Sequence, residues 1–87
     1  MEKLVATIPK SARDEIRVAL TEFRTKDAVH QMVSARVFFE DGPEHRPGRN
    51  GINVKVTLLP ALIGALQAAE LEARAAGLLP DQDKDAA

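Results

Sequence analysis

The chain contains no cysteine, which excludes disulfide bridges and thiolate metal sites and is typical of proteins from a reducing compartment. Tryptophan and tyrosine are missing too, so its aromatic residues are three phenylalanines. No apolar run approaches the roughly 20 residues of a membrane-spanning helix, and the first ten residues lack the basic-then-apolar layout of a signal peptide. We therefore expect a cytoplasmic protein that does not contact a membrane.

A large excess of charge of one sign is also missing, because the net charge of the 87 residues is only −1. The charges are unevenly spread, however: residues 10–57 hold nine basic and seven acidic side chains, whereas residues 81–85 (DQDKD) are mainly acidic. A chain of this length forms one domain and buries only about 60–65% of its extended surface. Any surface that binds an anion must therefore be local, and association would stabilise the fold.

Groups of residues typical of catalysis or metal binding are scarce. His30 and His45 do not have the spacing of a zinc motif, and the acidic residues near them fall in an expected loop. Ser11 and Ser34 lack the glycine-flanked turn and histidine partner of a nucleophile. We therefore expect no metal, no cofactor and no enzymatic activity.

Apolar residues alternate with polar ones over most of the first 57 residues. This period of two predicts strands at residues 4–8, 13–24, 29–40 and 52–57, with a turn at 25–27 and a Gly- and Pro-rich loop at 41–48. Consecutive strands with short connections form an antiparallel meander with one wet and one dry face. The predicted fold is α+β, a four-stranded antiparallel sheet followed by one C-terminal helix.

Helical periodicity replaces the alternation after residue 57. Leu59, Leu62, Ile63 and Leu66 share one helical stripe, and Gly77 suits the C-terminal cap. Further leucines lie off that stripe, so the helix carries more apolar surface than one small sheet can cover. We therefore predict a homodimer with these four residues at its interface. The expected domain covers residues 1–79, and residues 80–87 are expected to be a disordered acidic tail.

Two phenylalanines fall on the polar side of the alternation. Phe38 shares the parity of Arg36, and Phe23 shares that of Arg17, so both rings are expected on the wet face of the sheet. Exposed rings among arginines are typical of surfaces that stack and neutralise single-stranded nucleic acid. Phe38 could also be an ordinary exposed ring or one folded under the Pro-Gly loop, and a β-bulge could turn Phe23 inward.

The order of these elements, with three local strings, resembles the positive cofactor four family of transcriptional coactivators. The strings are residues 23–26 (FRTK), 36–39 (RVFF) and 46–52 (RPGRNGI), the last with Asn50 where relatives often have a basic residue. The resemblance covers about residues 16–71. It implies a curved sheet, a dimer, and a small bacterial member that binds single-stranded DNA near the nucleoid and supports transcription, replication or repair.

The predicted nucleic-acid contacts comprise two stacking rings and seven cations, namely Phe23, Phe38, Arg17, Arg24, Lys26, Arg36, Arg46, Arg49 and Lys55. The cations would hold phosphates and the rings would stack bases, with little sequence preference. Each cation could instead be a solvated charge with an acidic neighbour. RNA is also a possible ligand, and transcription machinery a possible partner. The alternative function is a protein-interaction module that uses the same face of the sheet.

Overall fold

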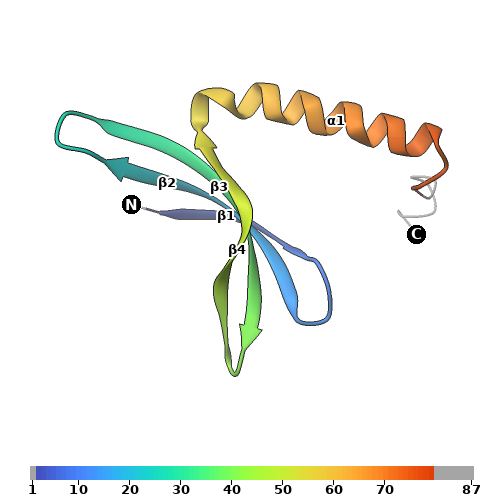
Figure 1. Ribbon diagram of the computed structural model, residues 1–87, viewed down its shortest axis with the longest axis horizontal. Coiled ribbons are helices and arrows are strands. Elements are labelled where there is room, and N and C mark those ends of the chain that lie inside the picture. Colours follow the sequence, from blue (N-terminus) through green and yellow to red (C-terminus); the bar gives the residue numbers. More distant parts are fainter. Residues whose placement is uncertain (1, 80–87) are drawn as a thin grey trace. The chain divides into compact units, whose positions relative to one another are not determined.

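The computed structural model of the protein describes residues 2–79, and the predicted acidic tail lies outside them. The elements in chain order are β1 (Lys3–Pro9), β2 (Asp14–Arg24), β3 (Val29–Asp41), β4 (Glu44–Lys55), the short 3₁₀ helix η1 (Val56–Leu58) and α1 (Leu59–Ala75) (Figure 1). The chain divides into a sheet unit that ends at Thr57 and a helical unit that begins at Leu58. Each is described by itself below.

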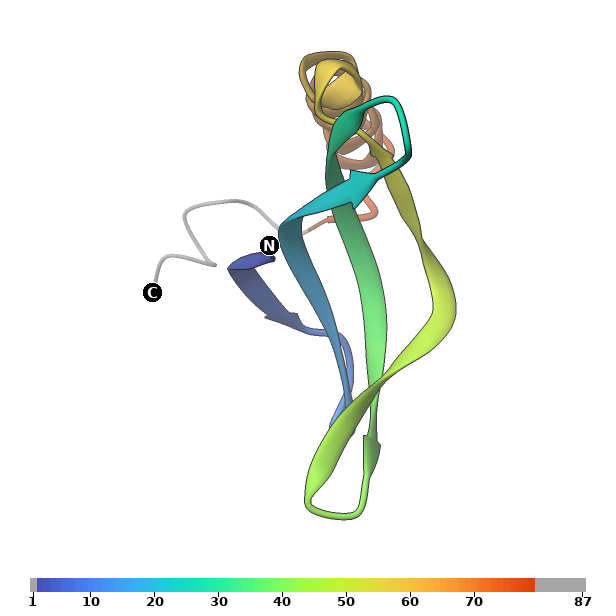
Figure 2. The same ribbon diagram turned by 90° about the vertical axis from the view of Figure 1, so that its left-hand side faces the viewer.

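The sheet unit is an antiparallel meander with strand order β1-β2-β3-β4. Its strands twist and curl strongly, as Figure 2 shows. The long β2–β3 pairing runs from Asp14 opposite Phe39 to Arg24 opposite Val29 without a register shift. The predicted fold, a four-stranded antiparallel curved sheet followed by one helix, is confirmed.

The predicted two-faced alternation is present in the strand pairing. Directly opposite residues point to the same side of a sheet. The central cross-strand rows are Arg17–Arg36–Gly51 and Ala19–Ser34–Asn53 on one side and Leu20–Val33–Val54 on the other. We call the first side the polar face and the second the apolar face. Among the described residues the buried apolar side chains are Val33 on the apolar face and Ala19 on the polar face, so a single chain covers little of its apolar face.

The segment predicted as a loop at residues 41–48 is mostly strand, which corrects the sequence-based boundary. The connection is a tight turn at Gly42, whose φ is 64°, and β4 already begins at Glu44. Pro47 pairs opposite Phe38 within this strand. Proline is tolerated there because β4 is an edge strand, where a missing N–H interrupts no second ladder. The RPGRNGI string therefore lies inside a strand.

A β-bulge interrupts β4 between its pairings with Phe38 and Arg36. Gly51 follows the bulge with a φ of 146°, and a Cβ atom there would lie 2.5 Å from the Ala35 carbonyl oxygen and 2.7 Å from the Arg36 Cα. No side chain can take this place without moving the backbone of β3. The bulge places Arg49 and Asn50 outside the regular ladder.

The helical unit agrees with its predicted boundaries. Leu58 precedes α1 without a side-chain cap, proline occupies the first turn, and Gly77 follows the end of the helix with a φ of 75°. No residue of α1 is buried. Residues Val56–Ala75 are, by length and composition, apolar enough to cross a membrane. The expectation that no apolar run approaches that length was wrong, because the many leucine and alanine residues of this segment outweigh its polar residues and its three charged residues, Glu70, Glu72 and Arg74, in mean hydropathy.

Candidate nucleic-acid interface

Five of the nine predicted contacts share the polar face of the sheet. They are Arg17 and Phe23 on β2, Arg36 and Phe38 on β3, and Lys55 on β4. The strand register explains this, since Arg17 pairs with Arg36, and Lys55 pairs with Met32, which has the parity of Phe38. The structure therefore brings both rings and three cations to one surface.

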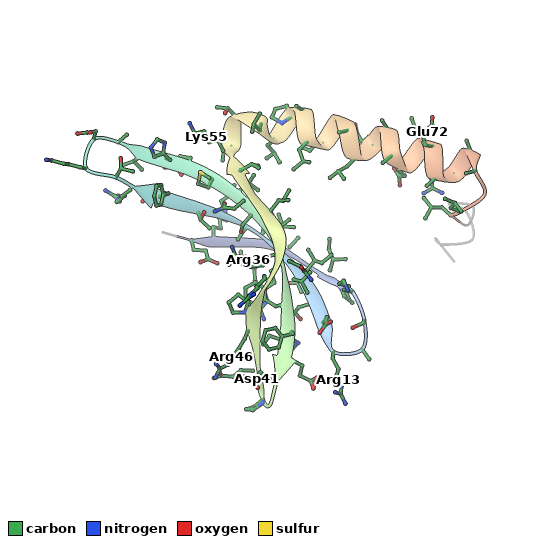
Figure 3. The ribbon with its side chains drawn as sticks, in the orientation of Figure 1. Arg13, Arg36, Asp41, Arg46, Lys55 and Glu72 are labelled. Atoms are coloured by element: carbon green, nitrogen blue, oxygen red, sulfur yellow. The ribbon has the colours of Figure 1, made fainter. Side chains whose placement is uncertain are left out.

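Two predicted contacts lie on the opposite side of their strands. Arg24 follows Phe23 and forms an ion pair with Glu22 at 3.2 Å, and Arg46 forms one with Asp41 at 2.5 Å. A hydrogen bond from Gln31 lowers the pKa of Glu22, which keeps this carboxylate charged beside Arg24. In Figure 3, Arg46 and Asp41 lie together at the end of the β3–β4 hairpin, far from Lys55. These two arginines are separated from the shared surface.

The remaining two predicted contacts lie outside the regular ladder. Lys26 is in the turn between β2 and β3, and Arg49 is in the bulge of β4. Within residues 2–79, no acidic side chain forms an ion pair with Arg36, Arg49, Lys55 or Lys26. Cations without such partners keep their charge for an external anion, whereas Arg24 and Arg46 are already partly neutralised.

Phe23 is the more accessible of the two rings, with 59% of its surface exposed. It pairs across the strands with His30, and the two ring centroids are 6.1 Å apart with an interplanar angle of 30°. His30 supports one side of the ring, so Phe23 is held as a platform at the end of the β2–β3 hairpin. A flat, supported ring suits stacking by any base.

Phe38 is half-buried, and two neighbouring side chains cover part of its ring in the free protein. The Arg17 guanidinium carbon lies 4.3 Å from the centre of its ring, and Pro47 is its cross-strand neighbour. Glu15 holds this arginine through a contact of 2.5 Å, and His45 lies 3.7 Å from the same carboxylate. Arg17 therefore makes a cation–π contact in the free protein. A base would meet a composite surface of guanidinium and ring edge.

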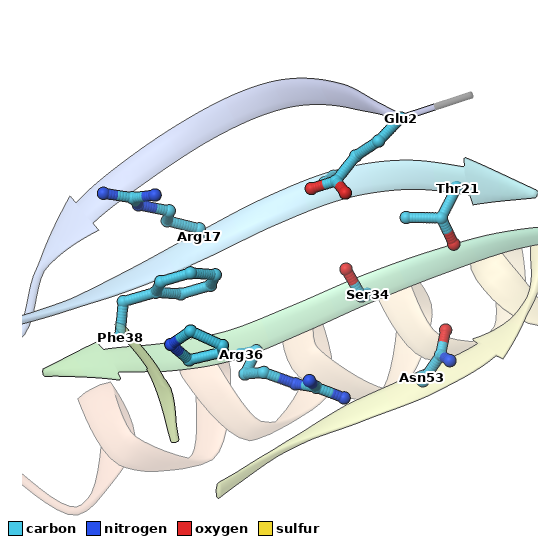
Figure 4. A pocket seen from close by; sticks show the side chains of 9 residues that line it. Glu2, Arg17, Thr21, Ser34, Arg36, Phe38 and Asn53 are labelled. Atoms are coloured by element: carbon cyan, nitrogen blue, oxygen red, sulfur yellow. The ribbon is translucent and has the colours of Figure 1, made fainter. Parts of the chain in front are cut away.

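A hollow of about 290 Å³ lies on the polar face beside Phe38 (Figure 4). Arg17, Arg36 and Phe38 line one end of it, and Thr21, Ser34, Asn53 and Glu2 line the rest. The sequence interpretation did not include these last four residues among the contacts. Thr21, Ser34 and Asn53 share the parity of the predicted contacts on their strands, and that shared parity was the available signal.

The part of the chain that the structure describes holds no group of three histidine, aspartate or glutamate side chains able to bind a metal ion. The polar face offers cations, rings, hydroxyls, an amide and the carboxylates of Glu2 and Glu15. These groups bind anions, stack planar ligands and form hydrogen bonds.

Comparison with known proteins identifies a related fold. The structure is similar to the crystal structure of a PC4 homolog from Burkholderia pseudomallei, with a TM-score of 0.67 and 27% sequence identity over 80% of this chain and 98% of that one. PC4 is an abbreviation of positive cofactor four, so the fold implied by the sequence resemblance is the fold found. No protein-family model matches the chain. No curated protein matches it either.

Proposed function

We propose that this protein is a bacterial, PC4-like protein that binds single-stranded or locally melted DNA with little overall sequence preference. The polar face would capture phosphates through Arg36 and Lys55 and stack bases on Phe23 and on the Arg17–Phe38 pair. It would act as a binding protein without catalysis, metal or cofactor. The homology of its structural neighbour to PC4 supports a nucleic-acid ligand.

One observation carries the proposal. The exposed ring of Phe23 shares one face of the sheet with two cations, Arg36 and Lys55, which form no ion pair with an acidic side chain among residues 2–79. Phe23 is 59% exposed, and Arg36 and Lys55 share its face. Stacking of a base on an aromatic ring contributes ~1–3 kcal/mol and tolerates any base. This local arrangement supports binding even though the net charge of the chain is −1.

The proposed active species is a homodimer. Leu59 and Leu62 are half-buried in α1, whereas Ile63 is 46% and Leu66 61% exposed, and both of the latter line a shallow apolar groove. Phe39 and Ile52 on the apolar face of the sheet are also exposed. Burial of such surface contributes roughly 25 cal/mol per Å². A second copy would cover these residues and would also combine two polar faces into one longer binding surface.

The proposed role is support of transcription, replication or repair in the cytoplasm, in association with the nucleoid. Locally opened duplex presents the unstacked bases that an aromatic platform needs. Partners from the transcription machinery fit this role, since a coactivator-like protein must meet polymerase where the duplex is open. The apolar α1 segment that could cross a membrane would instead lie in the dimer interface.

The test is a titration of a fluorescent oligo-dT at two salt concentrations, with duplex of the same length as the control. We expect tight binding of the single strand, with a slope of log K against log salt near −3 if Arg36 and Lys55, together with Lys26 in the turn and Arg49 in the bulge, neutralise about four phosphates. An oligo-U of the same length tests RNA as the ligand. Absence of salt-dependent binding to every strand would refute the proposal and favour the protein-interaction alternative, which the near-neutral charge fits.

A further inference from the structure

We infer that the hollow on the polar face is a subsite that reads one nucleobase and prefers a base with an exocyclic amino group. The inference rests on the proposed function and adds selectivity to it. Stacking on Phe23 accepts every base, whereas the hollow offers hydrogen-bonding groups directed at a base edge. The ligand class is therefore a cytosine, adenine or guanine base within a single strand, in preference to thymine or uracil.

The depth of the hollow comes from one cross-strand row of short side chains. Ala19 on β2 pairs with Ser34 on β3, and Ser34 pairs with Asn53 on β4. Ala19 is only 3% exposed although it lies on the polar face, so it forms a closed floor. The next row toward the bulge holds Arg17 and Arg36, whose longer side chains form a rim. A space of about 290 Å³ remains between them.

The groups at the end of the hollow away from Phe38 include one carboxylate and several groups that both donate and accept hydrogen bonds. Figure 4 shows Glu2, Thr21, Ser34 and Asn53 around the hollow, opposite Phe38 and Arg17. The Glu2 carboxylate only accepts, and the Ser34 hydroxyl and the Asn53 amide both donate and accept. Within residues 2–79, the side chains of these three residues form no hydrogen bond with one another or with neighbours. Their capacity is therefore available to a ligand.

The Glu2 carboxylate favours entry of a base, rather than a phosphate, of the nucleic acid into the hollow. A carboxylate repels phosphate but accepts a hydrogen bond from an amino group, as acidic side chains do with cytosine N4. Asparagine pairs in the same way with the amino group of adenine. Thymine and uracil carry a carbonyl oxygen in place of this amino group, and that oxygen would be repelled by a carboxylate placed against position 4. Arg36 on the rim of the hollow and Arg49 in the bulge would bind the phosphates on either side of the base.

The wall of the hollow suits a planar ligand. Arg17 lies 4.3 Å over the ring of Phe38, so the end of the hollow presents a guanidinium and the edge of an aromatic ring. Both groups stack or pack against a base, and the ion pair with Glu15 fixes the arginine in this position. The base is thus flanked on one side while its polar edge meets Glu2 and Asn53.

The experiment compares oligo-dC with oligo-dU of equal length at neutral pH. These bases have the same ring size, so differences in stacking are small. They differ in the hydrogen-bonding groups at positions 3 and 4, where cytosine has an acceptor nitrogen and an amino group and uracil has an N–H group and an oxygen. We expect dC to bind about three- to tenfold more tightly than dU, as one or two hydrogen bonds contribute. In Glu2→Gln and in Asn53→Ala the ratio should fall close to one, with dU affinity changed less than about twofold.

The matched control is Arg49→Ala, which removes a cation outside the hollow. It should weaken dC and dU binding by the same factor and leave their ratio intact. Equal affinity of the parent protein for dC and dU would overturn the subsite while oligo-dT binding still supports the proposed function. A ratio that survives in both Glu2→Gln and Asn53→Ala would also overturn it. If no strand binds at all, the proposed function and the subsite fall together. Glu2 is exposed, so Glu2→Gln keeps the test valid should Asn53→Ala fail to fold.

Discussion

Replacement of Phe23 by alanine separates binding from folding more cleanly than any other change on the polar face. The ring is 59% exposed and is supported on one side by His30, so it contributes little to the interior of the sheet. Full burial of such a side chain is worth roughly 1.5–3 kcal/mol, and less than half of this ring is covered. We therefore expect Phe23→Ala to cost about 1 kcal/mol of folding free energy.

The expected effect on binding is larger than the effect on stability. Loss of one base–aromatic stack costs ~1–3 kcal/mol, which raises the Kd for oligo-dT by roughly 5- to 150-fold. The salt slope should stay unchanged, because the substitution removes no charge. Fluorescence anisotropy at several salt concentrations measures both quantities, and thermal unfolding measures the stability.

Phe39→Ala is the matched control, because Phe39 is one of the two neighbours of Phe38 but lies on the apolar face, 42% exposed. This variant should lose stability or self-association while the folded protein keeps its affinity for oligo-dT. If Phe23→Ala binds as tightly as the parent, the ring is not a stacking platform. If both variants lose affinity in proportion to their loss of stability, the effect is one of folding, and the assignment of the polar face fails.

Three further predictions test the charges, the helix and the bulge. Arg36→Ala should weaken oligo-dT binding and reduce the salt slope by about 0.7, whereas Arg46→Ala, whose charge Asp41 already neutralises, should leave the slope unchanged in the same titrations. Leu66→Asp should lower the mass measured by light scattering, because a charge at a 61% exposed position would enter the dimer interface; an unaffected mass would exclude α1 from that interface. Gly51→Ala should destabilise the sheet by more than about 2 kcal/mol in denaturant unfolding, since its Cβ would lie 2.5 Å from a carbonyl oxygen. Gly64→Ala, with open space around its Cβ in the interior of α1, should instead stabilise by about 0.5–1 kcal/mol.

The alternation of apolar and polar residues predicts most of the sheet. Period-two patterns set which side chains share a face, so parity alone places Arg17, Phe23, Arg36 and Phe38 on one surface. Parity also separates Arg24 from Phe23, because neighbouring residues of a strand point to opposite sides. The structure adds the acidic partner, Glu22, that completes this separation. Strand extent was less predictable, since Gly and Pro in residues 41–48 resemble a loop.

Tertiary structure decided the features that depend on register between strands. Pairing of β3 with β4 places Asn53 beside Ser34 and Pro47 beside Phe38, and a one-residue shift would have separated both pairs. The cation–π contact of Arg17 with Phe38 and the closed floor at Ala19 are also consequences of cross-strand distance. The amino-acid order by itself therefore determined the strand faces and the helix. Only the folded sheet determined which cations are neutralised and where a hollow forms, because both depend on residues that are distant along the chain.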